Sequence, residues 1–394
     1  MPQREVVFVS AVRTGVGDFG GALKDVAPCE LGATVIREAV ARAGVDPASI
    51  GHVFMGHVIN TEPRDMYLSR VAALKAGLPQ SVAAANVNRL CGSGLQAIVS
   101  AAQTILLGDT EVAVAGGAES MSRAPYSSPS QRWGARMGDA KSVDMLVGAL
   151  SDPFDAVHMG ITAENVAARH EISRAAQDAL AVESHRRAAR AWREGWFASQ
   201  IVPVETIVKR KTVPFAADEH VRDDVTAESL AALRAVFQKD GTVTAGNASG
   251  INDGAGALVL MEAGEAARRG IKPLARLVAW GHAGVEPLYM GIGPVPATRA
   301  ALKKAGLKIG DIDVIEANEA FAAQACAVAK ELDFDPERVN PNGSGISIGH
   351  PVGATGSIIA TKAIHELQRT GGKRALVTMC IGGGQGIAAI LERA

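Results

Sequence analysis

The stretch NRLCGSGLQAIVSAAQTILLGDTEVAVA, residues 88–115, contains both kinds of element from which the fold is predicted. Leu95–Leu107 is rich in alanine and long enough for a helix. Gly108 follows where a helix end favours the left-handed backbone that glycine adopts readily. Glu111–Ala115 is a short apolar run typical of a strand. A helix followed directly by a strand indicates an α/β fold.

The same alternation continues on both sides of this stretch. Short apolar runs predict further strands at Val6–Val9, Ala257–Met261, Leu274–Val278, Asp313–Ile315 and Ala375–Met379. Alanine-rich segments predict further helices at Leu31–Ala43, Pro296–Ala305 and Gly353–Gln368, with Gly44 and Gly306 at two of the helix ends.

Two parts of the chain repeat each other. In residues 39–45 and again in residues 301–307 a helix stops at glycine, and an apolar strand begins about six residues later. The helix and strand after Cys91 are likewise echoed by Gly353–Gln368 and Ala375–Met379. The repeat predicts two related halves.

Residues 124–248 interrupt this pattern. The segment has many charges, three of the four tryptophans and proline-containing turns, and Glu164–Arg193 is predicted as a polar, exposed helix. We interpret the segment as an insertion between strands of the first half, and such insertions often cover an active site. The predicted domains are therefore 1–123 with 249–273, the insertion 124–248, and 274–394.

Composition restricts the function. The 394 residues suffice for two or three domains, and 47% are hydrophobic, which is enough for a large core. A formal net charge of −1 gives no indication of binding to nucleic acid or to an anionic membrane. A local basic run such as residues 209–211 can still attract a polyanion, and a solvated loop explains the run equally well.

The four cysteines, Cys29, Cys91, Cys326 and Cys380, are far apart and form no Cys-x-x-Cys pair. We therefore expect free thiols, no zinc site and no disulfide framework. The N-terminal sequence has no signal-peptide core, and no uninterrupted apolar run reaches the 18 residues of a membrane span. These patterns predict a cytoplasmic protein without a membrane segment.

Cys91 lies in the motif Asn-Arg-Leu-Cys-Gly-Ser-Gly, directly before a predicted helix. The free N–H groups and the dipole of a helix N-terminus favour a thiolate, and the glycines allow a substrate to approach. A small buried cysteine on a tight turn explains the motif about equally well.

His350 lies in Gly-His-Pro-Val-Gly-Ala-Thr-Gly, residues 349–356. The following proline disfavours helical geometry at His350 and suits the first turn of the next helix. A histidine held at such a junction can take a proton from a thiol. A hydrogen-bonded loop histidine is the alternative.

Cys380 opens the run Cys-Ile-Gly-Gly-Gly-Gln-Gly at the end of a predicted strand, a position where α/β sheets often carry active sites. The N–H groups of a glycine run that includes Gly382 can stabilise an oxyanion. The spacing of a phosphate-binding loop or a dinucleotide fingerprint is missing, and a simple glycine turn is the alternative.

Asn318 lies in Glu-Ala-Asn-Glu-Ala-Phe-Ala, residues 316–322, just after a predicted strand. Its amide can orient a water molecule or donate a hydrogen bond. A helix N-terminal cap is the alternative interpretation.

Together these four motifs resemble the thiolase family. Cys-x-Ser-Gly, Asn-Glu-Ala-Phe, Gly-His-Pro-x-Gly and Cys-x-Gly-Gly-Gly occur in the family's order, and residues 6–14 and 246–250 match as well. The resemblance extends over essentially all 394 residues. It implies the thiolase fold: two duplicated βαβ-type halves in a five-layer α-β-α-β-α sandwich, with an inserted α/β loop domain.

The resemblance also implies catalytic roles. Cys91 would be the acylated nucleophile, His350 would activate it, and Cys380 would exchange the proton on the α-carbon. Asn318, through a water molecule, and His350 would form one oxyanion hole. The backbone N–H groups of Cys91 and Gly382 would form the other.

Coenzyme A and acyl-CoA would be substrates, with no tightly bound cofactor and no metal. The positions that match the family's coenzyme A channel lie mostly on the insertion, with Arg222 expected beside the adenine and phosphates. They are His158, Met159, Arg222, Phe237, Ala245, Ser249 and Phe321.

Finer features resemble one branch of the family. Gly-Ala-Thr-Gly after Val352 and Gly-Gly-Gly-Gln after Ile381 look like the biosynthetic, tetrameric type. Residues 61–66 and 122–137 resemble bacterial broad-range β-ketothiolases linked to polyhydroxyalkanoate synthesis. The expected reaction is a reversible Claisen condensation of two acyl-CoA molecules, in fatty acid metabolism or polyhydroxyalkanoate biosynthesis, by a homotetramer.

Three other functions fit these motifs less well. A decarboxylating ketoacyl synthase of the same fold would pair one cysteine with two histidines or with His and Asn, whereas Cys380 occupies the second position here. A non-catalytic acyl-CoA or lipid-binding relative would have lost a cysteine or His350. A cysteine hydrolase has little use for a second thiol and two oxyanion sites.

Overall fold

Two halves with the same strand connectivity form the body of the protein in a computed structural model that describes residues 4–208 and 210–394. The first three residues and Lys209 of the basic run lie outside the described part. In the first half the strands are β1 (Val6–Thr14), β3 (His52–Gly56), β4 (Ala83–Val87), β5 (Val112–Ser120) and β11 (Asn252–Glu262). In the second they are β12 (Ala275–Gly284), β13 (Val314–Ala317), β14 (Arg374–Ile381) and β15 (Gln385–Arg393).

The strand pairing demonstrates the duplication. In the first half β1 pairs antiparallel with β11, β11 antiparallel with β5, and β5 parallel with β3. In the second half β12, β15, β14 and β13 pair in the same order and with the same directions. The two sheets touch edge to edge through Val7 opposite Arg276 and Phe8 opposite Ala275. The predicted pair of related halves is therefore confirmed.

Helices connect the strands in both halves. They are α1 (Pro28–Ala43), α2 (Leu68–Lys75) and α3 (Ser93–Leu107) in the first half, with α8 (Ala263–Arg268) after β11, and α9 (Pro294–Ala305), α10 (Ala322–Leu332), α11 (Gly345–Ile348) and α12 (Thr355–Thr370) in the second. Gly44, Gly108 and Gly306 end their helices with φ of 63°, 85° and 66°, as predicted.

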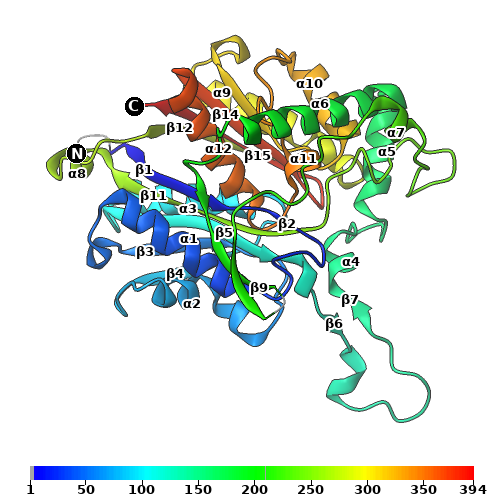
Figure 1. Cartoon of the computed structure of the whole chain (residues 1–394), viewed down its shortest axis with the longest axis horizontal. Helices are drawn as coiled ribbons and strands as arrows, with labels where there is room; N and C mark the ends of the chain where they lie inside the picture. The colour runs from blue at the N-terminus through cyan, green and yellow to red at the C-terminus, as the bar shows by residue number, and fades with distance from the viewer. Residues whose placement is uncertain (1–3, 209) are drawn as a thin grey trace.

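Five layers result from the packing (Figure 1). Helices α1 and α2 cover the outer face of the first sheet, and α9 packs on the outer face of the second. Between the sheets α3 packs against α12, and each of the two helices contacts strands of both halves. The predicted α-β-α-β-α sandwich is therefore the observed architecture.

The stretch Leu90–Leu107 is long and apolar enough to cross a membrane by length and composition alone. It includes α3, and nine residues of that helix are buried inside the sandwich, among them Leu95, Ile98 and Ile105. Its apolar character is thus explained by its place in the central layer.

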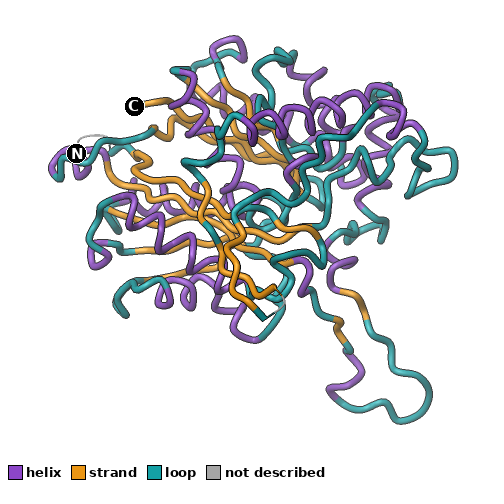
Figure 2. Tube along the Cα trace, in the orientation of Figure 1, coloured by secondary structure: helices purple, strands orange, loops and turns teal. Residues whose placement is uncertain are grey.

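The segment between β5 and β11 forms small elements over one end of the sandwich. They are β6 (Tyr126–Ser127), β7 (Val143–Asp144), α4 (Met145–Ala149), α5 (Met159–Arg169), α6 (Arg174–Arg193), β8 (Ile201–Val202), β9 (Val204–Val208), β10 (Lys211–Phe215) and α7 (Ala227–Ala231). Strand β8 pairs with the end of β1, while β2 (Gly17–Asp18) pairs with β11. Figure 2 shows the loop between β6 and β7 projecting from the body as an arm.

The prediction of a single exposed helix at Glu164–Arg193 was wrong. The chain turns between α5 and α6, where Glu171 has a φ of 56° and Ile172 is buried. Helix α6 also buries one face, including Gln177, Ser184 and His185, against neighbouring segments. Its buried side chains are small or polar, so they did not stand out as an apolar stripe.

Candidate active site

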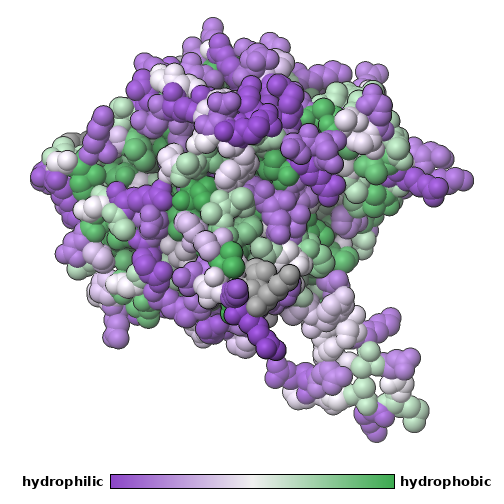
Figure 3. Space-filling view, viewed as in Figure 1, coloured by the Kyte–Doolittle hydropathy of each residue, from purple (hydrophilic) through white to green (hydrophobic). Residues whose placement is uncertain are grey.

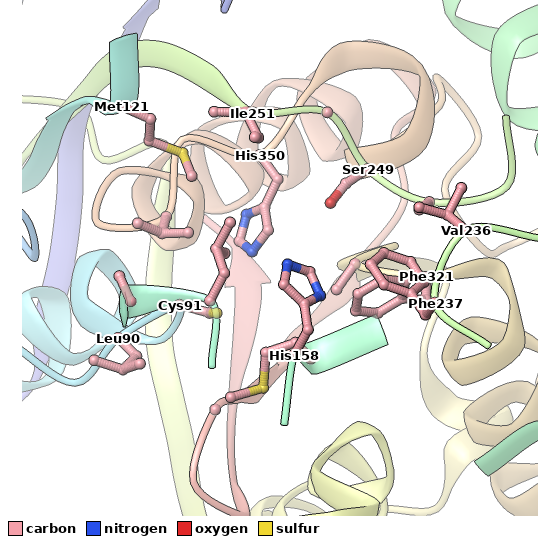
Figure 4. Close-up of a pocket in the computed structure, with 18 of the residues that line it drawn as sticks. Leu90, Cys91, Met121, His158, Val236, Phe237, Ser249, Ile251, Phe321 and His350 are labelled. Carbon is pink, nitrogen blue, oxygen red and sulfur yellow. The ribbon is translucent and has the colours of Figure 1, made fainter. Parts of the chain in front are cut away.

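A cavity of about 400 Å³ lies where the insertion meets the two halves. Figure 4 shows Cys91, His158 and His350 pointing into it from different segments. Of the predicted residues, nine line this cavity: Cys91, His158, Met159, Phe237, Ala245, Ser249, Phe321, His350 and Gly382. Asn318, Cys380 and Arg222 do not, and each lies next to it in a way described below.

Cys91 lies two residues before the first residue of α3, as the glycine-rich motif predicted. Leu90 turns the chain there with a φ of 44°. The backbone N–H groups of Gly382 and of Cys91 itself favour the sulfur anion, but burial outweighs them and raises the pKa of the Cys91 thiol. The expected helix-terminal thiolate is therefore not the resting state, and attack requires a base.

His350 follows α11 and is buried. Its backbone N–H donates to Oδ1 of Asn252 at 2.9 Å, and its ring Nδ1 lies 2.6 Å from Oγ1 of Thr355. Burial lowers the pKa of His350 to about 4. The ring is consequently neutral at pH 7 and can accept a proton.

Asn318 lies between β13 and α10 and does not line the cavity. Its Nδ2 is 3.5 Å from Nε2 of His350, and its Oδ1 is buried without a hydrogen-bond partner in the described part of the chain. The adjacent Glu319 holds the loop by accepting from Ser184 at 2.6 Å and from Asn340 at 2.8 Å. A polar amide atom is thus available beside His350 for a water molecule or another polar ligand atom.

Cys380 is the next-to-last residue of β14 and is fully buried. Burial and the nearby Cys91 both raise the pKa of its thiol. Gly383 and Gly384, with φ of 81° and 83°, make the tight turn into β15 that brings the Gly382 N–H to the Cys91 sulfur. The two thiols and this amide are therefore collected at one end of the second sheet.

The aromatic part of the cavity comes mostly from the insertion. The rings of His158 and Phe237 stack with their centroids 4.7 Å apart, and Phe321 meets Phe237 edge-on at 6.2 Å. His158 Nδ1 accepts from the N–H of Gly160 at 3.0 Å and so caps α5. A Cβ on Gly160 would overlap the ring of Phe237, which explains the glycine.

Arg222 lies in a second hollow of about 350 Å³. This hollow shares Ala245 and Ala248 with the first cavity, so the two adjoin. His185 and His220 line it together with Arg222. An elongated ligand can therefore run from Cys91 past Ala245 to the guanidinium of Arg222.

A hydrogen-bonded chain joins the second hollow to His350. His220 Nδ1 lies 2.5 Å from Oδ1 of Asp18, and Nδ2 of Asn252 donates to the same oxygen at 3.3 Å. Asn252 in turn accepts the backbone N–H of His350. This chain of hydrogen bonds could not be predicted, because its members are more than 30 residues apart in the sequence.

Glu119 was missed by the sequence interpretation. Its buried carboxylate accepts from the N–H groups of Val58, Ile59 and Gly353 at 3.0, 3.1 and 2.9 Å, and His57 lies at 3.3 Å. A Cβ on Gly353 would overlap this carboxylate. The signal was a carboxylate directly after the apolar run 112–118.

Several apolar residues that line the cavity were missed too, because in a sequence they resemble ordinary core. They are Leu90, Met121, Leu150, Ile251, Met290 and Val352.

The chain was compared with known proteins. Residues 6–264 match the family model described as thiolase, N-terminal domain, and residues 271–393 match thiolase, C-terminal domain. Beta-ketothiolase BktB of Cupriavidus necator is 67% identical over 391 residues, which are 99% of both chains.

Two solved structures are also similar. The Bacillus anthracis acetyl-CoA acetyltransferase superposes with a TM-score of 0.97 at 48% identity, covering 100% of this chain and 99% of that one. Human mitochondrial 3-ketoacyl-CoA thiolase in complex with CoA gives a TM-score of 0.96 at 44% identity, covering 100% and 98%.

Proposed function

The chain belongs to the thiolase family and is a thiolase-type acyltransferase, and on this premise we propose how its residues divide the reaction. The observation that carries the proposal is the meeting of Cys91, the neutral ring of His350 and the Gly382 N–H in the cavity wall, with Cys380 buried near Cys91. A Claisen condensation needs one group to hold an acyl unit and another to remove a carbon-bound proton. The two thiols meet these two needs.

In the first half-reaction Cys91 is acylated. Nε2 of His350 takes the thiol proton as the sulfur attacks the thioester carbonyl of acyl-CoA. The negative charge that develops on the carbonyl oxygen is stabilised by the N–H groups of Cys91 and Gly382. The carbon–sulfur bond to coenzyme A breaks, and coenzyme A leaves as a thiol with the proton from His350.

In the second half-reaction the thiol proton of Cys380 passes to Nε2 of His350, and the resulting Cys380 thiolate removes a proton from the α-carbon of acetyl-CoA. The enolate oxygen accepts from the protonated Nε2 of His350 and, through a water molecule, from Asn318. The enolate carbon attacks the acyl group on Cys91, the bond to Cys91 breaks, the Cys91 sulfur takes the proton from Nε2 of His350, and 3-ketoacyl-CoA results. Two oxyanion sites are needed because the charge develops on a different thioester oxygen in each half-reaction.

Coenzyme A is proposed to extend through both hollows. Its pantetheine arm would lie against His158, Met159, Phe237, Ala245, Ser249 and Phe321, and its nucleotide beside Arg222. The insertion, 124–248, would thus be a loop domain that covers the coenzyme A site. Coenzyme A and acyl-CoA would be bound only as substrates.

For the substrate range we propose a broad-range β-ketothiolase that joins acetyl-CoA to acetyl-CoA or to a short or medium acyl-CoA. The apolar cavity lining and the 67% identity to a protein named beta-ketothiolase support this. Cytoplasmic polyhydroxyalkanoate synthesis is the proposed setting. The intact Cys380 and His350 disfavour a decarboxylating synthase or a non-catalytic binding protein.

We further propose a homotetramer assembled through the arm. Trp133 and Met137 lie in the arm between β6 and β7, with 88% and 98% of their surfaces exposed. Figure 3 shows the arm standing clear of the body. An arm of this kind gains stability when a second copy covers its apolar side chains. The double variant Trp133→Ser with Met137→Ser should lower the mass measured by light scattering. Leu107→Ser, which changes an exposed residue outside the arm, should leave the mass unchanged.

The deciding experiment has two parts. Incubation with acetyl-CoA followed by peptide mass mapping should place an acetyl group on Cys91, and label on Cys380 alone would reverse the assignment. Thiolysis of 3-ketoacyl-CoA substrates of increasing chain length should proceed beyond acetoacetyl-CoA. Cleavage of acetoacetyl-CoA only would contradict the broad-range proposal.

A further inference from the structure

Thr355 contacts the ring of His350 and does not line the cavity. It is the first residue of α12 and is 1% exposed. Its Oγ1 lies 2.6 Å from Nδ1 of His350 and 2.9 Å from the backbone carbonyl of Pro351. The hydroxyl therefore has two partners in a site closed to solvent.

The single hydroxyl proton decides how these two contacts are made. The carbonyl of Pro351 has no proton to give, so the Thr355 hydroxyl donates to it. The lone pairs of Oγ1 then face Nδ1, and a hydrogen bond forms only when Nδ1 carries the proton. A neutral imidazole has one ring proton, so Nε2 is left with a free lone pair.

The other side of the ring agrees with this assignment. Nδ2 of Asn318, a donor, lies 3.5 Å from Nε2. A proton on Nε2 would confront this donor, whereas a lone pair attracts it. Both neighbours of the ring therefore favour the same tautomer.

We propose that Thr355 is a positioning residue that keeps His350 in the Nδ1–H tautomer, so that Nε2 can take the proton of Cys91. The inference rests on the proposed function, in which His350 is the base for Cys91. Once Nε2 is protonated, the ring becomes an imidazolium that still donates from Nδ1 to Thr355. The same hydroxyl thus serves the ring before and after proton transfer.

The test replaces the hydroxyl while keeping its shape. Thr355→Val leaves Nδ1–H without a partner and allows the Nε2–H tautomer, which cannot accept the thiol proton. Alkylation of Cys91 by iodoacetamide at pH 7, measured without any CoA compound, should slow about 10- to 100-fold, as when a partner that orients a histidine is lost. Thr355→Ser should stay close to the unaltered enzyme. The alkylation rate of Thr355→Val should recover only at higher pH, where the thiol ionises without a base.

Ser357→Ala provides the matched control. Ser357 is also buried in α12 and donates to a backbone carbonyl, Ala354 O at 2.7 Å, without touching a site residue. If Thr355→Val keeps the same alkylation profile as Ser357→Ala, the inference is overturned. His350→Gln distinguishes a failure of this inference from a failure of the proposed function. Unchanged alkylation in that variant would show that His350 is not the base for Cys91 and would overturn the proposed function.

A direct measurement avoids any dependence on the folding of Thr355→Val. Nitrogen-15 NMR of the unaltered enzyme labelled at histidine, with His350→Gln identifying the signal, reports which ring nitrogen is protonated. The expected result is a protonated Nδ1 at neutral pH. A protonated Nε2 would overturn the inference.

Discussion

Arg13 and Asp218 form a two-pronged ion pair, with distances of 2.7 and 3.0 Å, in which neither side chain is exposed. Asp218 also accepts from the N–H of Val16 and from the indole of Trp192. Arg13 belongs to β1, whereas Asp218 and Trp192 belong to the insertion. This pair therefore fastens the insertion to the first sheet.

Asp218→Asn should destabilise the protein strongly because it leaves the Arg13 charge buried and unpaired. The expected loss in the free energy of unfolding is about 3–5 kcal/mol, measured by urea denaturation. Glu38→Gln removes a half-exposed partner of Arg42 and should cost about 0.5 kcal/mol at most. Equal losses in the two variants would contradict the assigned role.

Cys380→Ser should separate the two half-reactions. A hydroxyl is a far poorer carbon base than a thiolate, so condensation of acetyl-CoA should fall to background. Acetyl transfer to Cys91 should persist because it does not use Cys380. Peptide mass mapping and a condensation assay on the same preparation measure both, and condensation near the normal rate would exclude Cys380 as the base.

Arg222→Ala should weaken the binding of coenzyme A through its nucleotide. A hydrogen bond to a charged group contributes about 1–2 kcal/mol here, so KM for coenzyme A should rise roughly tenfold with kcat mostly unchanged. A short pantetheine thioester has no nucleotide and should react as before. An equal loss with both substrates would show that Arg222 supports the fold, and Arg299→Ala, on α9, serves as the control for removing an arginine.

Stability should depend on pH through His350. In the unfolded chain the pKa of His350 is near 6.5, and burial lowers it to about 4 in the folded protein. Between these values the unfolded state binds more protons, so this residue's contribution falls as pH drops from about 6.5 to about 4.

His350→Gln isolates that contribution. The free energy of unfolding of the unaltered protein minus that of the variant should decrease by up to about 3 kcal/mol over this pH range. Other titrating groups, including Glu316 whose burial raises its pKa to about 7, are common to both proteins and cancel in the difference. A difference independent of pH would show that His350 titrates normally in the folded state.

The sequence predicted those helices and motifs that are determined by residues close together in the chain. The ends of α1, α3 and α9 were predicted because a glycine supplies the left-handed residue at each end. The chemical motifs could be found because Cys91, His350 and Cys380 stand in short glycine-rich runs. Strand β15 was not predicted: its inner residues, such as Ala388 and Ala389, have little strand preference, and pairing with β12 and β14 defines it.

Long-range contacts explain what was missed. The helix-terminal position of Cys91 was predicted, but its raised pKa depends on burial by segments distant in sequence. The role of the Glu119 carboxylate depends on N–H groups that the fold brings to it from other segments. The hydrogen bond between His350 and Thr355 depends on the orientation of the His350 ring, which the sequence does not define. The assignment of the coenzyme A residues rested on family resemblance because their apolar and aromatic side chains have no distinctive spacing.

The central layer has a consequence for how the molecule comes apart. Helix α3 of the first half and α12 of the second bury their side chains against each other and against both sheets. A separated half would expose an apolar helix face to water, so neither half is an independent folding unit. The molecule should therefore lose its structure in one cooperative transition. Because Cys91 belongs to the first half and His350 to the second, the two side chains can meet only when both halves are folded.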